Sequence, residues 1–265
     1  MADLFREKYG PWAIVAGASE GLGEAFAREI AARGVNVVLV ARREEAVRKL
    51  AEDIARTAGV ETQAIAADLS ERAGLERIIL ETAVLDVGLL VYNAGQSFIG
   101  PFWETELDQH LKEIDVNVRG PMVLAHAIGA RLRARRRGGI VLMSSLAGFQ
   151  GSALISNYAA TKAYNLVLGE GLWDELRAGG VDALVCCAGA TSTPNYQKSA
   201  PATKEAIAPQ TPEAVAREAL DYLGRGPLLI TGWANRLASF FLRRVLPRKL
   251  AVRIMGQNTR KMYCS

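Results

Sequence analysis

A glycine-rich turn near the start of the chain constrains the fold more than any other feature. It follows an apolar run, residues 12–16, and precedes residues 24–33, which are rich in alanine and carry apolar residues at helical spacing. The backbone of such a turn bends tightly and approaches a pyrophosphate, whose charge faces the N-terminus of the following helix. The order strand, turn, helix therefore predicts a dinucleotide-binding unit rather than a purely structural turn. Contacts to the cofactor are expected from Gly17, Ser19, Glu20, Gly21, Leu22 and Gly23.

The same alternation of apolar runs and helical stretches continues along the chain. Further strands are expected at 35–41, 63–67, 87–92, 139–144, 182–188 and 228–231, and helices at 44–58, 70–82, 106–132, 158–177 and 212–223. The runs are apolar throughout, which indicates a parallel sheet covered on both faces. Right-handed crossovers then give a doubly wound α/β sheet of the Rossmann type. Gly120-Pro121 lies inside one long helical stretch and leaves room for a kink or break.

Length and composition limit the classes of protein to which this chain can belong. The 265 residues suffice for one large domain, and no repeat or linker divides residues 1–232. Residues 1–8 are polar, unlike a signal peptide, and no apolar window could span a membrane. Adjacent Cys186 and Cys187 in an apolar run are typical of buried thiols in a cytoplasmic protein, not of a metal site. His110 and His126 are expected as ordinary core or surface residues, and no motif suggests a nucleic-acid partner.

The tip of the second expected strand favours one dinucleotide over another. A carboxylate there would bind the ribose hydroxyls of NAD, but this chain carries Ala41-Arg42-Arg43. Two guanidinium groups fit a 2′-phosphate through charge-assisted bonds. We therefore expect NADP(H), bound through Arg42 and Arg43; the alternative is a solvated basic pair balanced by Glu44 and Glu45.

Tyr158 and Lys162 lie four residues apart in an expected helix, so they share one face. A phenol with a pKa near ~10 is a weak acid at neutral pH, and a neighbouring ammonium lowers that pKa. The pair could exchange a proton with an alcohol or carbonyl. Alone, the spacing would equally suit an ordinary helix surface.

Several motifs together resemble the short-chain dehydrogenase/reductase family over about residues 10–232. They are Gly17-x-x-x-Gly21-x-Gly23, Asp68, Asn93-Ala94-Gly95, Asn117, Ser145 and Tyr158-x-x-x-Lys162, in the family's order and spacing. The resemblance implies that Tyr158 is the catalytic acid/base and that Lys162 lowers its pKa and binds the nicotinamide ribose. It implies that Ser145 holds the substrate oxygen and that Asn117 anchors a water for proton relay.

The resemblance also implies the remaining cofactor contacts and shows departures. Besides Tyr158 and Lys162, the implied contacts are Asp68, Leu69, Asn93, Ala94, Gly95, Gly189, Thr191 and Thr193. Tyr92 stands where the family often has asparagine, which is expected to be harmless. Ala188 replaces a frequent proline, and Glu20 replaces a basic residue used by some members, which leaves the 2′-phosphate to Arg42 and Arg43. The runs Arg6-Glu-Lys-Tyr-Gly-Pro-Trp12, Gly17-Ala-Ser-Glu-Gly21 and Ala41-Arg-Arg-Glu-Glu45 more narrowly resemble the NADP-dependent 7β-hydroxysteroid dehydrogenases, and this match weakens after about residue 70.

These features predict an oxidoreductase that transfers a hydride between NADP(H) and a ketone or secondary alcohol. An apolar substrate such as a hydroxysteroid is expected, with Ser97, Phe149 and Tyr196 as contacts and residues 191–212 as a substrate loop. A 3-oxoacyl thioester reductase and a non-catalytic NADP(H)-binding regulator are the alternatives. A homodimer or homotetramer is expected.

The C-terminal appendage, residues 233–265, differs in charge from the rest. Residues 228–265 hold eight Lys or Arg and no Asp or Glu, although the whole chain has a net charge of +4. Apolar residues are interleaved with these cations. The appendage is expected to cap the active site or pack in an oligomer, to lie on an acidic membrane surface, or to steer an anionic substrate.

Overall fold

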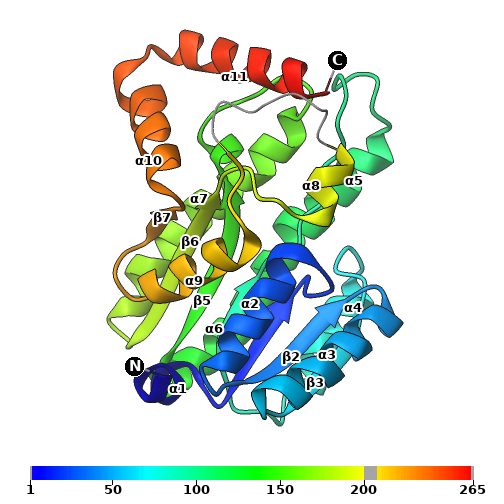
Figure 1. The fold of residues 1–265 in the computed structure, drawn as a ribbon, viewed down its shortest axis with the longest axis vertical. Coiled ribbons are helices and arrows are strands. Elements are labelled where there is room, and N and C mark those ends of the chain that lie inside the picture. The colour runs from blue at the N-terminus through cyan, green and yellow to red at the C-terminus, as the bar shows by residue number, and fades with distance from the viewer. Residues whose placement is uncertain (1, 200–207, 264–265) are drawn as a thin grey trace.

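Seven parallel strands form one sheet in the computed structural model, which describes residues 2–199 and 208–263 (Figure 1). The strand order is β3-β2-β1-β4-β5-β6-β7. The strands are β1 (Trp12–Ala16), β2 (Asn36–Ala41), β3 (Thr62–Ala66), β4 (Val87–Tyr92), β5 (Gly138–Ser145), β6 (Val181–Ala188) and β7 (Leu228–Ile230). Because β1 pairs with both β2 and β4, the winding direction reverses beside β1, where doubly wound sheets bind ligands at the carboxyl edge.

Helices cover both faces of this sheet. They are α1 (Ala2–Tyr9), α2 (Gly21–Ala32), α3 (Glu44–Ala58), α4 (Arg72–Glu81), α5 (Leu107–Ile114), α6 (Gly120–Arg135), α7 (Ser156–Arg177), α8 (Pro194–Ser199), α9 (Pro212–Tyr222), α10 (Trp233–Phe240) and α11 (Arg248–Tyr263). Buried residues of α2, α3 and α9 form one core with the sheet, and those of α4, α6 and α7 form the other. The predicted doubly wound sheet is thus confirmed.

The alternate residues of β2 show why the strands are apolar throughout. Val37 and Leu39 point into the first core, whereas Val38 and Val40 point into the second, and all four are fully buried. A polar residue at either set of positions would need a buried hydrogen-bonding partner. The expected strands agree with the structure to within a residue or two; α1 and α8 were not predicted, and α2 begins earlier than expected, inside the glycine motif.

The helix expected over 106–132 is interrupted by a π turn, Asp115–Arg119, between α5 and α6. The N–H of Gly120 donates to the carbonyl of Asp115, five residues back. Pro121 has no N–H, so the carbonyls of Val116 and Asn117 cannot be paired by it within the helix. The interruption that Gly120-Pro121 suggested is therefore a widened turn, which exposes two carbonyls to other donors.

The appendage comprises α10, a second π turn (Phe241–Val245) and α11, which Figure 1 shows across the carboxyl edge of the sheet. The Arg248 guanidinium donates to the carbonyl of Phe149 at 2.6 Å, and Arg243 lies 4.0 Å from the centre of the Phe149 ring. The hydroxyls of Ser152 and Thr259 are 2.5 Å apart and buried. No helix among the described residues has the length and apolar character needed to cross a membrane. Part of the expected substrate loop, residues 200–207, and Cys264 lie outside the described residues.

Candidate active site

The glycine motif leaves no room for side chains. A Cβ on Gly17 would lie 2.6 Å from the Cα of Ala94, and one on Gly23 would lie 1.9 Å from the carbonyl oxygen of Gly17. Gly17 and Gly21 also have positive φ angles of 85° and 59°, which favour glycine. The Asn93 side chain donates to the Gly17 carbonyl at 2.9 Å. The turn, the N-terminus of α2 and the end of β4 thus form one cradle of the kind that approaches a pyrophosphate.

The far side of this cradle is the loop after β6. A Cβ on Gly21 would lie 3.0 Å from the side chain of Thr193, so the two predicted cofactor segments face each other closely. Thr191 donates to the Gly189 carbonyl at 3.1 Å, and the Thr193 hydroxyl accepts from the N–H of Tyr196. The structure therefore brings together Gly21 and Thr193, which are 172 positions apart in the chain (193 − 21), as a single bound dinucleotide requires.

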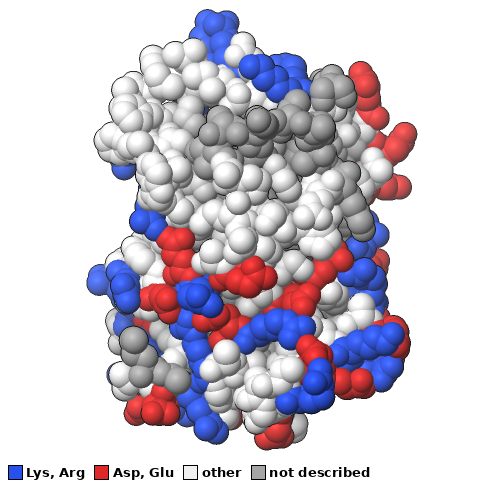
Figure 2. All heavy atoms as spheres, viewed as in Figure 1, with Lys and Arg blue, Asp and Glu red and all other residues white. Residues whose placement is uncertain are grey.

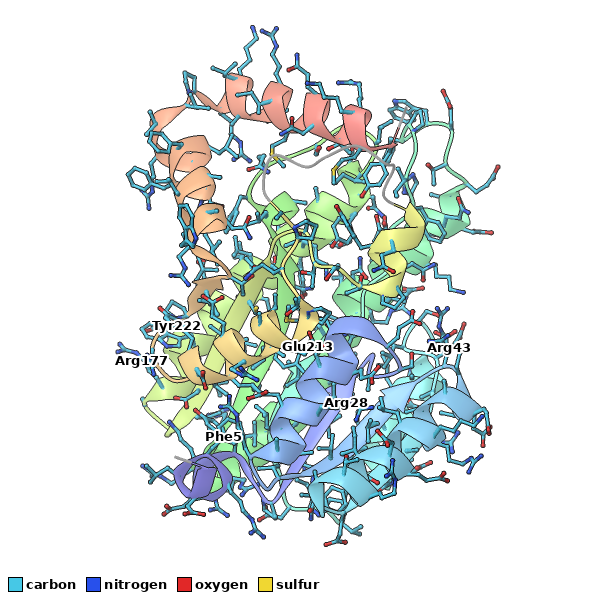
Figure 3. All side chains as sticks on the ribbon, in the orientation of Figure 1. Phe5, Arg28, Arg43, Arg177, Glu213 and Tyr222 are labelled. Atoms are coloured by element: carbon cyan, nitrogen blue, oxygen red, sulfur yellow. The ribbon has the colours of Figure 1, made fainter. Side chains whose placement is uncertain are left out.

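The two arginines after β2 have different surroundings. Arg43, labelled in Figure 3, forms an ion pair with Glu20 at 2.6 Å and donates to Ser19 at 3.3 Å. Arg42 is exposed and forms no ion pair with any residue that the structure describes. Glu44 and Glu45, the partners considered from the sequence, pair with neither, since Glu45 binds Arg48 and Lys49. Of the two arginines at this strand tip, Arg42 is thus the one without an ion-pair partner within the described residues.

Asp68 and Leu69, expected beside the adenine ring, follow β3. Leu69 is buried. Burial of the Asp68 carboxyl acts to raise its pKa, but two hydrogen bonds from Ser70 and the nearby charge of Arg42 outweigh it and lower the pKa. The Asp68 carboxylate accepts from the Ser70 N–H at 2.9 Å and from its hydroxyl at 2.7 Å. The carboxylate is therefore ionised and its loop is fixed.

Tyr158, Lys162 and Ser145 meet at the carboxyl ends of β5 and β6. Burial raises the pKa of Tyr158 to about 12, and a hydrogen bond with Ser145 opposes that rise. Burial also lowers the pKa of Lys162 to about 8. The Lys162 ammonium donates to the Met143 carbonyl at 3.1 Å and lies 5.6 Å from the centre of the Tyr158 ring. At neutral pH, Tyr158 is a neutral proton donor beside a cation that favours its phenolate form.

Asn117 is fully buried on the π turn, and its side chain is already occupied. Its Oδ1 accepts from the N–H of Gln96 at 2.8 Å, and its Nδ2 donates to the Gln96 carbonyl at 2.8 Å and to the Thr161 hydroxyl at 3.0 Å. The expected role in anchoring a water stays a prediction, and with this side chain paired it would fall to the Asn117 main-chain carbonyl. A Cβ on Gly95 would lie 3.2 Å from the Lys162 Nζ and 3.8 Å from Asn117 Oδ1, so all three residues adjoin.

Four residues that support the site were not predicted as functional. Tyr92, expected only to be harmless, donates its hydroxyl to the Val116 carbonyl at 2.6 Å, and Asn165 donates to the Asn117 carbonyl at 3.0 Å. Buried Glu113 accepts from the N–H of Phe98 at 3.0 Å and from Asn157 at 2.6 Å. Burial raises the pKa of Glu113. Pro121 was the available signal, because its missing N–H leaves an upstream carbonyl in need of another donor.

The expected substrate residues occupy different environments. Ser97 is exposed, and Tyr196 is partly buried. Phe149 is buried against Leu166 and beneath Arg243, so its ring contacts the appendage as well as the core. Contact of these three side chains with substrate stays a prediction.

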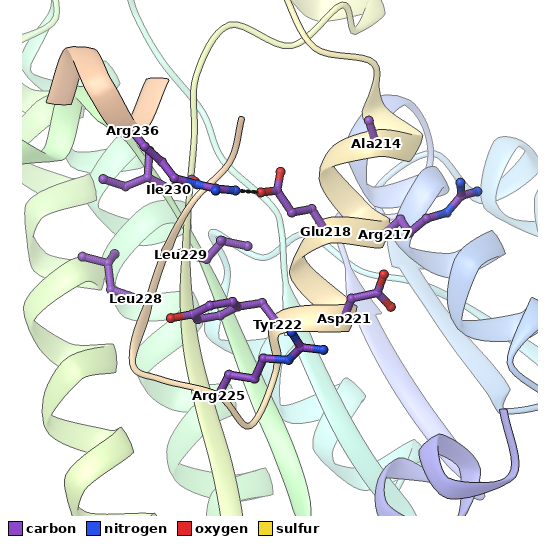
Figure 4. A pocket seen from close by; sticks show the side chains of 10 residues that line it. All are labelled: Ala214, Arg217, Glu218, Asp221, Tyr222, Arg225, Leu228, Leu229, Ile230 and Arg236. Carbon is purple, nitrogen blue, oxygen red and sulfur yellow. Dashed lines mark hydrogen bonds and ion pairs between the residues drawn. The ribbon is translucent and has the colours of Figure 1, made fainter. Parts of the chain in front are cut away.

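An open depression of about 790 Å³ lies away from these groups, between α9 and β7 (Figure 4). Its floor includes Tyr222 and Leu229, and the ion pair of Arg236 with Glu218 crosses its rim. None of the predicted site residues lines it. The hydrogen bonds and the shifted pKa values point instead to the carboxyl edge near β5 and β6 as the place of chemistry.

Several known proteins are similar to this chain in both sequence and fold. The short chain dehydrogenase family model matches residues 11–204. A 7β-hydroxysteroid dehydrogenase of Clostridium sardiniense is 36% identical over 233 residues, which cover 88% of this chain and 89% of the relative. A structure from work on the stereoselectivity of a 7β-hydroxysteroid dehydrogenase has a TM-score of 0.90 and 34% identity, and covers 95% of this chain and 98% of its own.

A second solved structure, a short-chain dehydrogenase from Sphingobium yanoikuyae in complex with NADPH, has a TM-score of 0.78 and 28% identity. The match covers 87% of this chain and 92% of that one. The matched residues include the glycine cradle and the Ser145, Tyr158 and Lys162 positions of this chain, which lie within residues 11–204. The chain therefore belongs to the short-chain dehydrogenase/reductase family and is an oxidoreductase acting on alcohols and carbonyl compounds.

Proposed function

We propose that this chain transfers a hydride between NADP(H) and the carbonyl group of an apolar ketone, such as a 7-oxo steroid, or the corresponding alcohol. The observation that carries the proposal is the meeting of Ser145, Tyr158 and Lys162 beside a glycine cradle with no space for a Cβ. The cradle fits a pyrophosphate at the N-terminus of α2. Asn117, Ser145, Tyr158 and Lys162 are the proposed catalytic residues.

In this proposal, the nicotinamide supplies or accepts the hydride when the cofactor is bound. Ser145 and Tyr158 donate hydrogen bonds to the carbonyl oxygen and stabilise the negative charge that develops on it. Tyr158 then gives its proton to that oxygen, since its raised pKa keeps it protonated at neutral pH. The Lys162 ammonium lowers the cost of the resulting phenolate and returns a proton to it.

The preference for NADP(H) rests on Arg42. This guanidinium is exposed at the tip of β2 and free of ion pairs within the described residues, whereas Arg43 is held by Glu20. A 2′-phosphate would give Arg42 a charge-assisted partner. The NADPH bound to the Sphingobium yanoikuyae relative supports the same choice.

The ratio of kcat/KM with NADPH to that with NADH tests this preference. Arg42→Asp should lower the ratio by about tenfold or more, since one charge-assisted bond contributes about 1.5–3 kcal/mol. Arg43→Ala should lower it less, because Arg43 is already paired, and exposed Arg56, on α3 away from the strand tip, provides the matched control Arg56→Ala. A wild-type preference for NADH would contradict the proposal.

The substrate class rests on the 7β-hydroxysteroid dehydrogenases that the chain resembles over most of its length. A panel of 7-oxo steroids, 3-oxoacyl thioesters and small aromatic ketones, followed by NADPH absorbance, separates the hydroxysteroid dehydrogenase from a 3-oxoacyl thioester reductase. Tyr158→Phe should reduce turnover below about a hundredth of wild type while NADPH still binds. If the wild-type protein binds NADPH but reduces no compound of the panel, the chain is better described as a non-catalytic NADP(H)-binding regulator.

A further inference from the structure

The carbonyls released by the π turn are paired by side chains from two different elements. Tyr92 at the end of β4 donates to Val116, and Asn165 in the middle of α7 donates to Asn117. Both donors are almost completely buried, with 1% and 2% of their surfaces exposed. The two bonds fasten the π turn to the sheet on one side and to the catalytic helix on the other.

The bond to Asn117 fixes the orientation of the Asn165 amide. A carbonyl oxygen only accepts, so the NH₂ group of Asn165 must face Asn117 and its Oδ1 must face away. That Oδ1 is buried and accepts no hydrogen bond from the residues that the structure describes. A buried acceptor without a donor costs about 1–3 kcal/mol, and buried polar atoms of this kind are commonly paired by an internal water.

The position of Asn165 relates it to the lysine. Asn165 is three residues beyond Lys162 on α7, so the two side chains are neighbours on one face of the helix. Both are buried, and the π turn packs against α7 here through Asn117, which also binds Thr161. The Lys162 Nζ and Asn117 Oδ1 both lie beside Gly95, at 3.2 and 3.8 Å from a Cβ placed there, so the ammonium adjoins the residue whose carbonyl Asn165 binds.

We propose that Asn165 is a positioning residue of the proton relay, and this rests on the proposed oxidoreductase function. Its Nδ2 fixes the Asn117 carbonyl, and its Oδ1 holds a buried water that also meets Lys162 and the second lone pair of that carbonyl. After reduction of a ketone, the Tyr158 phenolate takes a proton from the Lys162 ammonium. The lysine amine takes a proton from this water, and the water regains one from solvent through further waters.

A crystal structure of the wild-type protein at a resolution that shows ordered waters tests the binding part directly. We expect a water within about 3 Å of Asn165 Oδ1 and of the Asn117 carbonyl oxygen. A site without that water, or with a protein donor on Oδ1, overturns the proposal. This measurement needs no substrate, so it shows whether the water is bound even if no ketone of the panel is reduced.

The kinetic part compares Asn165→Leu with a matched control. Asn165→Leu removes both the clamp and the water acceptor at nearly constant volume, so kcat for reduction of a 7-oxo steroid should fall about tenfold or more. The solvent deuterium isotope effect on kcat should rise, because reprotonation becomes slow. Thr82→Val removes a buried polar group elsewhere, a hydroxyl just after α4 that donates to the Ile78 carbonyl at 2.8 Å. It should reduce stability and leave both kinetic quantities within about twofold of wild type.

A purely structural role for Asn165 gives a different result. Asn165→Leu would then lower the unfolding midpoint but keep the wild-type isotope effect and kcat, and this outcome overturns the proposal. If Asn165→Leu does not fold, Asn165→Ala replaces it, and the same two kinetic quantities decide.

Discussion

At the scale of single residues, the proposed catalytic pair of Tyr158 and Lys162 has opposite pKa shifts with one cause. Burial raises the pKa of Tyr158 to about 12 and lowers that of Lys162 to about 8, because the charged form of each loses solvation. Lys162 is 4% exposed, and the only hydrogen bond that its ammonium makes in the described part of the chain goes to the Met143 carbonyl. The lysine is therefore held at the site at a cost in stability, as functional groups often are.

The cost of burying Lys162 predicts that the free energy of unfolding depends on pH in an unusual way. Between the folded pKa of Lys162, about 8, and its usual value of 10.5, the unfolded chain binds a proton that the folded chain does not. Stability therefore rises with pH across this window. The free energy of unfolding of wild type minus that of Lys162→Met should increase by about 2 kcal/mol from about pH 7 to about pH 9.5. Urea unfolding without cofactor measures it, and a difference that is constant or falls with pH contradicts the burial argument.

At the scale of elements, the sequence predicted the strands and the glycine cradle but not the side chains that bind the carbonyls of the π turn. The glycine cradle was predictable because its three glycines are close in the chain and follow a strand. The pairing of Tyr92 with Val116 and of Asn165 with Asn117 was not, since these partners are 24 and 48 residues apart. A proline shows that a carbonyl needs another donor, and only the packing of β4 and α7 shows which one supplies it.

Gly120 tests how tightly this turn is packed. A Cβ there would lie 2.0 Å from the Tyr92 hydroxyl oxygen and 2.9 Å from the ring carbon that carries it. Because Tyr92 is buried and bonded to Val116, Gly120→Ala should cost about 1–3 kcal/mol of unfolding free energy. The same substitution in a Tyr92→Phe background should cost less, since the closest atom is gone. Equal costs in the two backgrounds, measured in urea, would show that the clash is relieved elsewhere.

At the scale of the whole molecule, the C-terminal appendage has an inner and an outer side. Its inner side packs on residues 146–155, which connect Ser145 to the helix that carries Tyr158. Its outer side exposes Trp233, Phe240 and Phe241, and Figure 2 shows Lys and Arg at the top of the molecule above a largely uncharged face. Composition alone predicted a basic, apolar segment. It could not choose between cap, oligomer contact, membrane contact and substrate steering, because the choice depends on which side faces the domain.

The contacts of α11 favour the cap, and the pair of buried hydroxyls provides the test. Thr259→Val removes the partner of Ser152 and loosens α11 over residues 146–155. We expect the KM for a 7-oxo steroid to rise about threefold or more, with kcat within about twofold and NADPH affinity unchanged, because the substrate side alone is affected. Thr57→Val on α3, where the hydroxyl bonds only within its own helix among the described residues, is the control.

Adding Ser152→Ala to Thr259→Val should recover part of the lost stability, since no hydroxyl then lacks a partner. An unchanged KM, together with co-sedimentation of wild type with acidic but not neutral vesicles, would assign the appendage to a membrane surface instead.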